Sequence, residues 1–407
     1  MGIPGDIVAP EVGNLGDLPL TLAEVEKMAK VKLPKHIYEF YASGSDSQSA
    51  LARNENAFNR LCIRPRVLID VSNIDTSIEI LGHRCSMPIG IAPSAMQKLA
   101  GGNGELDIAR AAVKMGLNLT LSSQSTTALE EVSGTREHGL MDSLPPPPFW
   151  MQIYLYEDVQ KSIGLIHRAE AAGYQALILT VDTPVLGNRL SERKTAVVLP
   201  EGMGLPNLDA AKPKSKAQPS LNRQLMNARS AAEAQSLRDK AGSKMHSSSL
   251  TWEKTINFLR SVTKMKIILK GIMTGEDAFL AVQHKVDGII VSNHGGRQLD
   301  SASSTIEALP EVADAVQKAI PVILDGGVRN GEAVFKSLAL GADFVLIGRP
   351  ALWGLAYKGQ EGVETVFNIM ERELNRTMAL AGTRNVEEIT KDKIGVIAKH
   401  GFGVSKL

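Results

Sequence analysis

A histidine, two glycines and an arginine follow a short apolar run near residue 290. The run, Ile289 to Val291, has the β-branched composition of a buried strand, and His294 and Arg297 come soon after it. A histidine can accept a proton near neutral pH, and an arginine three residues later can bind a carboxylate through two hydrogen bonds. A polar turn after a core strand uses the same residue types, so this segment needs support from elsewhere.

Polar or glycine residues end other apolar runs of the chain as well. They are Gln152 and Tyr154, Asp182 with Arg189 behind it, Lys270, Asp325 to Arg329, and Gly348 with Arg349. The carboxyl ends of parallel strands meet at one rim, which would bring a base, a carboxylate, several cations and a phenol around one cavity. The Gly-Gly-x-Arg and Gly-Arg turns are typical of a phosphate cradle in such a fold.

Eight apolar runs alternate with helical patterns from residue 87 onward. The runs span 88–95, 117–123, 149–155, 176–183, 266–271, 288–293, 321–327 and 344–348. Helices are predicted at 105–115, 158–172, 276–284, 305–318 and 331–340. The alternation predicts an α/β fold, a (β/α)8 TIM barrel. A doubly wound open sheet is the alternative, but no Gly-x-Gly-x-x-Gly follows the first run.

The barrel is predicted to occupy residues 87–407, with a helical segment over 1–86 packing on it. Helical patterns at 21–31 and 34–41 support that segment. The interval between Asp182 and Lys270 is much longer than one strand–helix unit. Within it, residues 200–249 are rich in Lys, Ala, Ser and Pro, and we expect a flexible lid over the active-site mouth. A passive insertion after the fourth strand is the alternative.

The amino-acid composition limits the kinds of partner that we expect for this protein. The chain has 407 residues and is 43% hydrophobic, so we expect a large core. Its net charge is +1, so we expect neither a nucleic acid nor a membrane as a partner. Cys62 and Cys85 form no metal-binding pattern and are expected to be free thiols. The closing Ser405, Lys406 and Leu407 match an address that the peroxisomal import receptor reads, which predicts a peroxisomal protein.

The segment Ser292 to Leu299, Ser-Asn-His-Gly-Gly-Arg-Gln-Leu, resembles the active-site signature of the FMN-dependent 2-hydroxy acid oxidases and dehydrogenases, which include glycolate oxidase. The resemblance extends from about Leu33 to Pro350, interrupted mainly by the insertion. It implies bound FMN, a homo-oligomer (tetramer or octamer) and this set of FMN contacts: Pro93, Ser94, Ala95, Ser122, Gln152, Thr180, Lys270, Ser292, Asp325, Gly326, Gly327, Arg329, Gly348 and Arg349.

The resemblance also implies catalytic roles. His294 would take a proton as the α-carbon of the substrate is oxidised, and Asp182 would stabilise the imidazolium. Arg297 and Arg189 would hold the substrate carboxylate, and Tyr154 would hydrogen-bond the hydroxyl. Lys270 would face the N1/O2 edge of the flavin, where a fixed ammonium stabilises the reduced anion.

Two residues depart from the family pattern, and both concern the substrate. Phe40 stands where the family usually has a tyrosine whose hydroxyl helps to bind the substrate carboxylate, and Gln124 stands where glycolate oxidase has tryptophan. A hydrogen bond to a charged group contributes about 1.5–3 kcal/mol, so small acids should bind less well. We expect a substrate larger than glycolate.

The electron acceptor is expected to be O2, giving hydrogen peroxide. Ala95 stands where some dehydrogenase relatives have glycine, and no haem-binding segment precedes the barrel. Three alternatives stay open: a dehydrogenase that uses another acceptor, an FMN barrel with non-redox chemistry, and an FMN-binding barrel whose pocket has lost activity. The complete set of Tyr154, Asp182, Lys270, His294 and Arg297 argues against the last.

Overall fold

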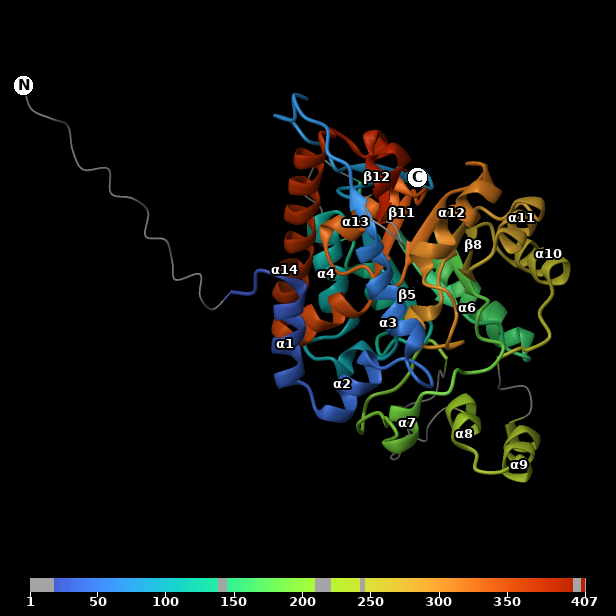
Figure 1. Ribbon diagram of the computed structural model, residues 1–407. Helices are drawn as coiled ribbons and strands as arrows, with labels where there is room; N and C mark the ends of the chain where they lie inside the picture. The colour runs from blue at the N-terminus through green and yellow to red at the C-terminus, as the bar shows by residue number, and fades with distance from the viewer. Residues whose placement is uncertain (1–17, 138–144, 209–220, 242–245, 398–403, 407) are drawn as a thin grey trace, which may run out of the picture.

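Eight parallel strands close into a barrel in the order β4 to β11 (Figure 1). This computed structural model describes residues 18–137, 145–208, 221–241, 246–397 and 404–406. The strands are β4 (Ile89–Ile91), β5 (Leu119–Ser122), β6 (Phe149–Ile153), β7 (Ala176–Thr180), β8 (Lys266–Ile272), β9 (Gly288–Val291), β10 (Val322–Asp325) and β11 (Phe344–Ile347). Each strand falls on one of the eight predicted runs. The predicted barrel is confirmed, and the open sheet was the wrong alternative.

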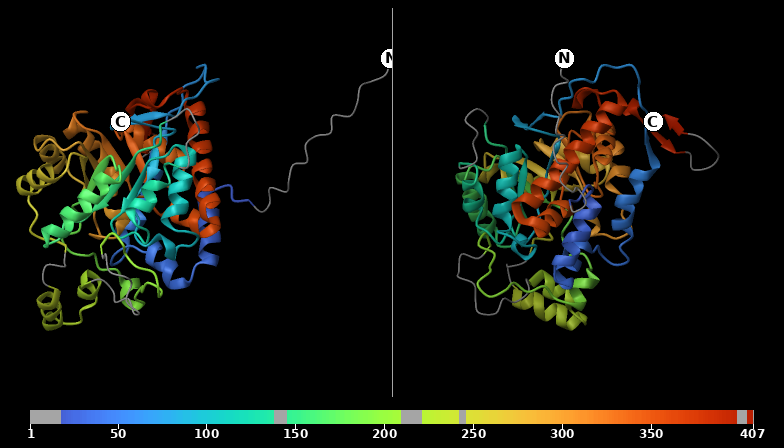
Figure 2. Two further views of the ribbon diagram at one scale, coloured as in Figure 1. Left: turned by 180° about the vertical axis from the view of Figure 1, so that it is seen from behind. Right: turned by 90° about the vertical axis from the view of Figure 1, so that its left-hand side faces the viewer.

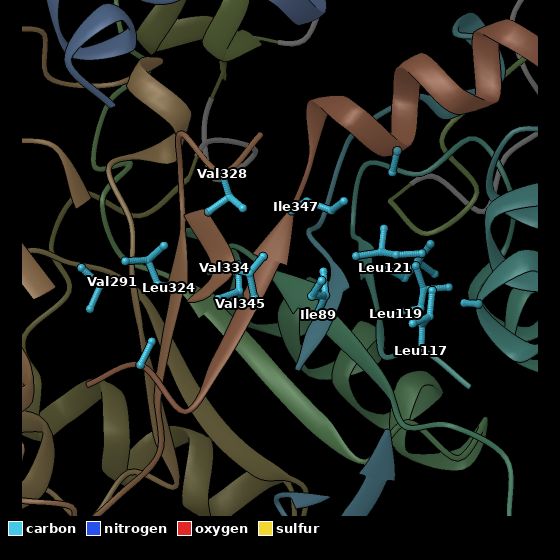
Figure 3. Packing of buried hydrophobic residues seen from close by; sticks show 14 of the residues in the cluster. Ile89, Leu117, Leu119, Leu121, Val291, Leu324, Val328, Val334, Val345 and Ile347 are labelled. Carbon is cyan, nitrogen blue, oxygen red and sulfur yellow. The ribbon is translucent and has the colours of Figure 1, made fainter. Parts of the chain in front are cut away.

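Successive side chains of each strand point alternately into and out of the barrel. On β7, Ile178 belongs to the core inside the barrel, whereas Leu177 and Leu179 belong to the layer between strands and helices. Figure 3 shows this outer layer around Ile89 and Val345. Both faces are therefore apolar, which explains why the strands have continuous β-branched runs instead of alternating polarity.

Helices cover the outside of the barrel. They are α4 (Glu105–Met115), α5 (Leu129–Gly134), α6 (Val159–Ala171), α10 (Trp252–Val262), α11 (Gly275–Gln283), α12 (Thr305–Val316), α13 (Gly331–Ala339) and α14 (Arg349–Ala381). The long α14 departs from helical geometry at Lys358 and Gly359 and lies beside α1 (Leu22–Lys32), as Figures 1 and 2 show. Ser304 and Glu307 form a capping box that fixes the start of α12.

The first described part of the chain contains the predicted helices α1 and α2 (Lys35–Ala42), followed by α3 (Ser49–Asn56). It also contains strands that the sequence did not indicate. β1 (Leu61–Ile63) pairs antiparallel with β12 (Ile394–Ile397), far along the chain. The hairpin of β2 (Ile78–Ile80) and β3 (His83–Cys85) places Ile80 and Cys85 against the core inside the barrel. This hairpin thus helps to complete the interior core.

The insertion after β7 contains short helices where the sequence predicted a loop. They are α7 (Leu190–Lys194), α8 (Leu221–Asn227) and α9 (Ala231–Ala241), and they lie below α2 in Figure 1. Of the three, α9 is alanine-rich and so has a high intrinsic helix propensity, which its weak apolar periodicity concealed. Residues 209–220 and 242–245 of the predicted lid lie outside the described residues.

The carboxyl end adds a third strand to the small sheet. β13 (Val404–Lys406) pairs antiparallel with β12, with Ser405 opposite Val396. Of the predicted peroxisomal address, Ser405 and Lys406 are therefore in a strand, and Leu407 lies outside the described residues.

Among the described helices, none combines the length and the apolar character needed to cross a bilayer.

Candidate active site

A cavity at the carboxyl ends of the strands gathers nearly all of the predicted site residues. Those that line it are Phe40, Pro93, Ser94, Ala95, Ser122, Gln124, Gln152, Tyr154, Thr180, Arg189, Lys270, His294, Arg297, Asp325, Gly326, Gly327, Arg329, Gly348 and Arg349. The other two predicted residues lie behind the lining: Asp182 contacts His294, and Ser292 contacts Lys270. The structure thus brings together residues from every strand end that the sequence singled out.

The two-residue period of the strands positions these side chains. Ile268 packs inside the barrel. Lys270 follows it by two residues on β8, so its side chain points to the same side of the strand and enters the cavity. Ile323 and Asp325 stand in the same relationship on β10. The same step relates Trp150 to Gln152 on β6 and Ile178 to Thr180 on β7. The polar site is therefore a continuation of the apolar interior core.

His294 and Asp182 form the centre of the site. The Nδ1 atom of His294 lies 2.9 Å from Oδ1 of Asp182. The His294 backbone has a left-handed φ of 59°, and its N–H donates to the Ser292 hydroxyl at 3.1 Å. Gly296 follows with φ of 77°, and a Cβ there would lie 2.6 Å from the Leu51 nitrogen. This position requires glycine because the loop packs directly on α3.

The environment of this pair favours a neutral histidine beside a charged carboxylate. Burial lowers the pKa of His294, and this effect outweighs the opposing influence of Asp182. Burial raises the pKa of Asp182, but His294 and Lys270 together lower it below its ordinary value. A neutral imidazole held by an ionised aspartate is competent to accept a proton.

Lys270 is a buried cation with two partners. Its Nζ atom donates to the Ser292 hydroxyl at 2.8 Å and lies 3.2 Å from Oδ2 of Asp325. Burial opposes its charge, but Asp325 and Asp182 raise its pKa, so the ammonium persists. A bulge follows at Gly271, with φ of 115°, where a Cβ would lie 2.7 Å from Cβ of Asp182. The glycine allows Asp182 to lie against β8 beside this ammonium.

Glu192 joins the two arginines that were predicted to bind the substrate carboxylate. Its carboxylate lies 3.2 Å from Arg189, 3.1 Å from Arg297 and 2.9 Å from Arg223. The side chain is 2% exposed, and burial raises its pKa less than the three guanidiniums lower it. Sequence reasoning missed Glu192 because a polar residue three positions after an arginine is unremarkable in a surface helix.

Phe40 lines the cavity between two cationic side chains. Its ring centroid is 5.3 Å from the guanidinium of Arg297 and 5.2 Å from that of Arg223. The neighbouring Tyr41 also lines the cavity, but its hydroxyl donates to the Met96 carbonyl at 2.7 Å. The hydroxyl of Tyr41 therefore does not replace the one that Phe40 lacks.

The insertion contributes three further residues that the sequence did not indicate, Leu186, Arg223 and His246. The His246 ring stacks on Tyr154 with centroids 4.3 Å apart and planes inclined by 13°. Burial, with a contribution from His294, lowers the pKa of His246 to about 4, so the ring is neutral near pH 7. No local pattern reveals these contacts, because they depend on how the insertion returns over the barrel.

Arg329 and Arg349 form the cationic corner of the cavity. Arg349 donates to the carbonyls of Tyr41 at 2.8 Å and Gly295 at 3.0 Å, and burial lowers its pKa to about 10. Arg329 pairs with Glu55 at 2.8 Å. The two arginines thus tie the first helices to the end of the barrel where Gly326 and Gly327 turn.

Comparison with known proteins identifies the family. The profile of the family described as FMN-dependent dehydrogenase matches residues 29–396. The chain belongs to this family. Glycolate oxidase 3 of Arabidopsis thaliana is 46% identical over 374 residues, covering 91% of this chain and 94% of the relative. 2-Hydroxyacid oxidase 1 of Mus musculus is 40% identical over 395 residues, covering 95% and 98%.

A solved structure of mandelate oxidase with (S)-4-hydroxymandelic acid superimposes with a TM-score of 0.80 at 34% identity. The match covers 96% of this chain and 100% of that structure. The family relationship therefore extends over the N-terminal helices as well as the barrel.

The cavity suits the FMN that this family uses. Oδ1 of Asp325 is buried and has no hydrogen-bond partner within the described part of the chain, so the site contains a buried acceptor whose hydrogen bond is not satisfied there. A Cβ at Gly348 would lie at ordinary contact distance from the Ala92 and Ser94 side chains, at 3.7 and 3.8 Å, so the described residues do not by themselves require glycine there. When FMN is bound, Lys270 would supply a cation for the flavin ring, and Arg329 would supply one for the phosphate. These residues belong to the FMN set that the family resemblance implies, and their contacts with FMN stay a prediction.

Proposed function

We propose that this FMN-dependent enzyme oxidises a 2-hydroxy acid larger than glycolate to the 2-oxo acid and passes the electrons to O2, giving hydrogen peroxide. The observation that carries the proposal is the His294–Asp182 pair, 2.9 Å apart, in a cavity lined by Arg189 and Arg297. A neutral base beside paired guanidiniums suits an anionic substrate that must lose a proton at its reacting end.

Each side chain has a role in this proposal. Arg297 and Arg189 bind the carboxylate, and Tyr154 donates to the substrate hydroxyl. His294 takes a proton from the substrate as its α-carbon is oxidised, and Asp182 stabilises the resulting imidazolium through the Nδ1 contact. FMN, when bound, accepts the two electrons that leave the substrate. Lys270 would hold a positive charge beside the flavin ring, where it would stabilise the reduced anion.

The substrate end of the cavity supports an acid with a side chain. Phe40 and Gln124 line it, together with Leu186 from the insertion. Phe40 offers no hydroxyl to the carboxylate, so the smallest acid gains little there. A side chain on the α-carbon can contact these residues and recover binding energy that glycolate cannot.

We also propose that the enzyme acts in the peroxisome as a homo-oligomer, a tetramer or an octamer. The Ser405-Lys406-Leu407 sequence supports recognition by the import receptor, and peroxide production suits that compartment. Light scattering of the FMN-loaded protein tests the assembly, and the import of a reporter fused to residues 394–407 tests the address.

The reaction is tested by following both products in air. The FMN-loaded protein is incubated with glycolate, lactate, mandelate and 2-hydroxyoctanoate, and 2-oxo acid and hydrogen peroxide are quantified. We expect equal amounts of both from one or more larger acids. Formation of 2-oxo acid only when a dye acceptor is added would indicate a dehydrogenase. Failure to form any 2-oxo acid with either acceptor would contradict the proposal.

A further inference from the structure

A second cavity adjoins the active-site cavity on the far side of Tyr154 and His246. We call it the side cavity; its own lining includes Leu155, Thr183, Pro184 and Leu250. The two cavities share three residues in their linings, and these are Tyr154, Thr180 and His246. The shared residues therefore form the wall that separates the two spaces.

His246 is the part of this wall that comes from the insertion. Its ring stacks on Tyr154 at 4.3 Å and meets Tyr156 edge-on at 5.2 Å. The backbone is held independently of the ring, because residue 246 forms a β-bridge with Tyr156 and the Ser247 N–H donates to the Leu155 carbonyl at 2.8 Å. A change of this side chain should therefore leave the segment in place.

We propose that His246 determines substrate specificity by closing the active-site cavity against the side cavity, which limits the length of the 2-hydroxy acid side chain. The inference rests on the proposed function, because it concerns the same substrate. Thr180 belongs to a barrel strand, and Tyr154 is assigned to the substrate hydroxyl. Of the three residues that form the wall, His246 is thus the one to which the proposed reaction assigns no role.

The surroundings of the side cavity suit a continuing aliphatic chain. Leu155, Val181, Pro184 and Leu250 are the apolar residues of its lining, and the polar residues beyond the shared wall are Thr183, Ser247 and Ser248. Each methylene that enters such a space gains about fourfold in affinity from burial. With the ring present, a long chain must displace an aromatic stack, so the natural substrate has a short or medium side chain.

The test compares His246→Ala with His246→Phe in the FMN-loaded enzyme. The ratio of kcat/KM for 2-hydroxyoctanoate to that for lactate is measured for each variant and for the wild type. We expect His246→Ala to raise this ratio at least tenfold, because alanine joins the two cavities. His246→Phe keeps a ring of similar size on Tyr154 and should leave the ratio within about threefold of the wild type.

An unchanged ratio in His246→Ala would overturn the inference while leaving the proposed function intact. If both kcat/KM values also fall equally, His246 only positions Tyr154; if neither falls, the ring has no role in substrate binding. FMN absorbance of each variant shows that the barrel is folded. The proposed function itself fails in a different way, when neither acid reduces the flavin of the wild-type protein.

Discussion

Asn54 and Asn293 exchange two side-chain hydrogen bonds, at 2.8 and 2.7 Å, between α3 and the loop that carries His294. Both amides are buried, and the Asn293 Oδ1 atom also accepts the Gly296 N–H at 3.1 Å. The pair holds the loop in the conformation that gives His294 its positive φ. The N-terminal helices are thus part of the support of the catalytic base.

The first prediction follows from this pair. Asn54→Ala removes the acceptor of one Asn293 amide hydrogen and of the Thr305 N–H, and a buried donor left without a partner costs about 1–3 kcal/mol. We expect that loss in the free energy of unfolding, together with slower flavin reduction. Urea unfolding of the FMN-loaded protein measures the first effect. Asn56→Ala, an exposed position on the same helix, is the control, and equal stability of the two variants would contradict the account.

The second prediction concerns Glu192. Glu192→Gln removes the carboxylate that neutralises Arg189, Arg223 and Arg297, and breaking a buried ion pair in this way costs about 3–5 kcal/mol. We expect a lower Tm that sulfate partly restores, because an added anion can occupy the guanidinium cluster. A Tm equal to that of the wild type, or a sulfate effect no larger than in wild type, would show that the cluster does not depend on Glu192.

The third prediction concerns pH. His294 must be neutral to accept a proton, and its pKa lies below the ordinary 6.5. Activity should therefore be constant near pH 7 and fall by about tenfold per unit once the pH drops below that pKa. Asp182→Asn removes a charge that raises the pKa of His294, so the acidic limb should move to lower pH.

The Asp182→Asn variant should also lose about 10²–10⁴ in its plateau rate, because the imidazolium loses its counter-charge. Stopped-flow reduction of the flavin across the pH range checks both effects. An acidic limb that shifts upward in Asp182→Asn would mean that the titrating group is another residue.

The fourth prediction concerns Phe40. Phe40→Tyr places a hydroxyl where the family usually has one, and a hydrogen bond to a carboxylate contributes about 1.5–3 kcal/mol. We expect kcat/KM for glycolate to rise at least tenfold, with a smaller gain for larger acids. Steady-state kinetics on both substrates measure the gain. Phe40→Leu controls for the two cation–π contacts of the ring, and no gain in Phe40→Tyr would remove Phe40 as the cause of discrimination.

The barrel was predictable because each strand is buried on both faces and so has a continuous apolar run. Part of the cavity lining was predictable from polar residues at the strand ends, such as Lys270 and Asp325, which follow interior residues by one strand period. Phe40, Gln124 and the residues from Pro93 to Ala95 were expected only from the family resemblance. Glu192 and His246 could not be found in this way. Their roles depend on where the insertion folds back over the barrel, and a short helix or an isolated bridge leaves little local pattern. The pairing of β1 with β12 also joins segments too far apart for any sequence period to reveal.

The most direct test of the account is the anaerobic reduction of bound flavin in the wild type and in His294→Gln. Mixing the wild-type protein with a reactive 2-hydroxy acid should bleach the yellow flavin rapidly. His294→Gln should keep its FMN and its spectrum but fail to bleach, because glutamine cannot accept the proton. Bleaching of the variant within tenfold of the wild-type rate would show that His294 is not the base, and no bleaching of the wild type by any 2-hydroxy acid would contradict the proposed reaction.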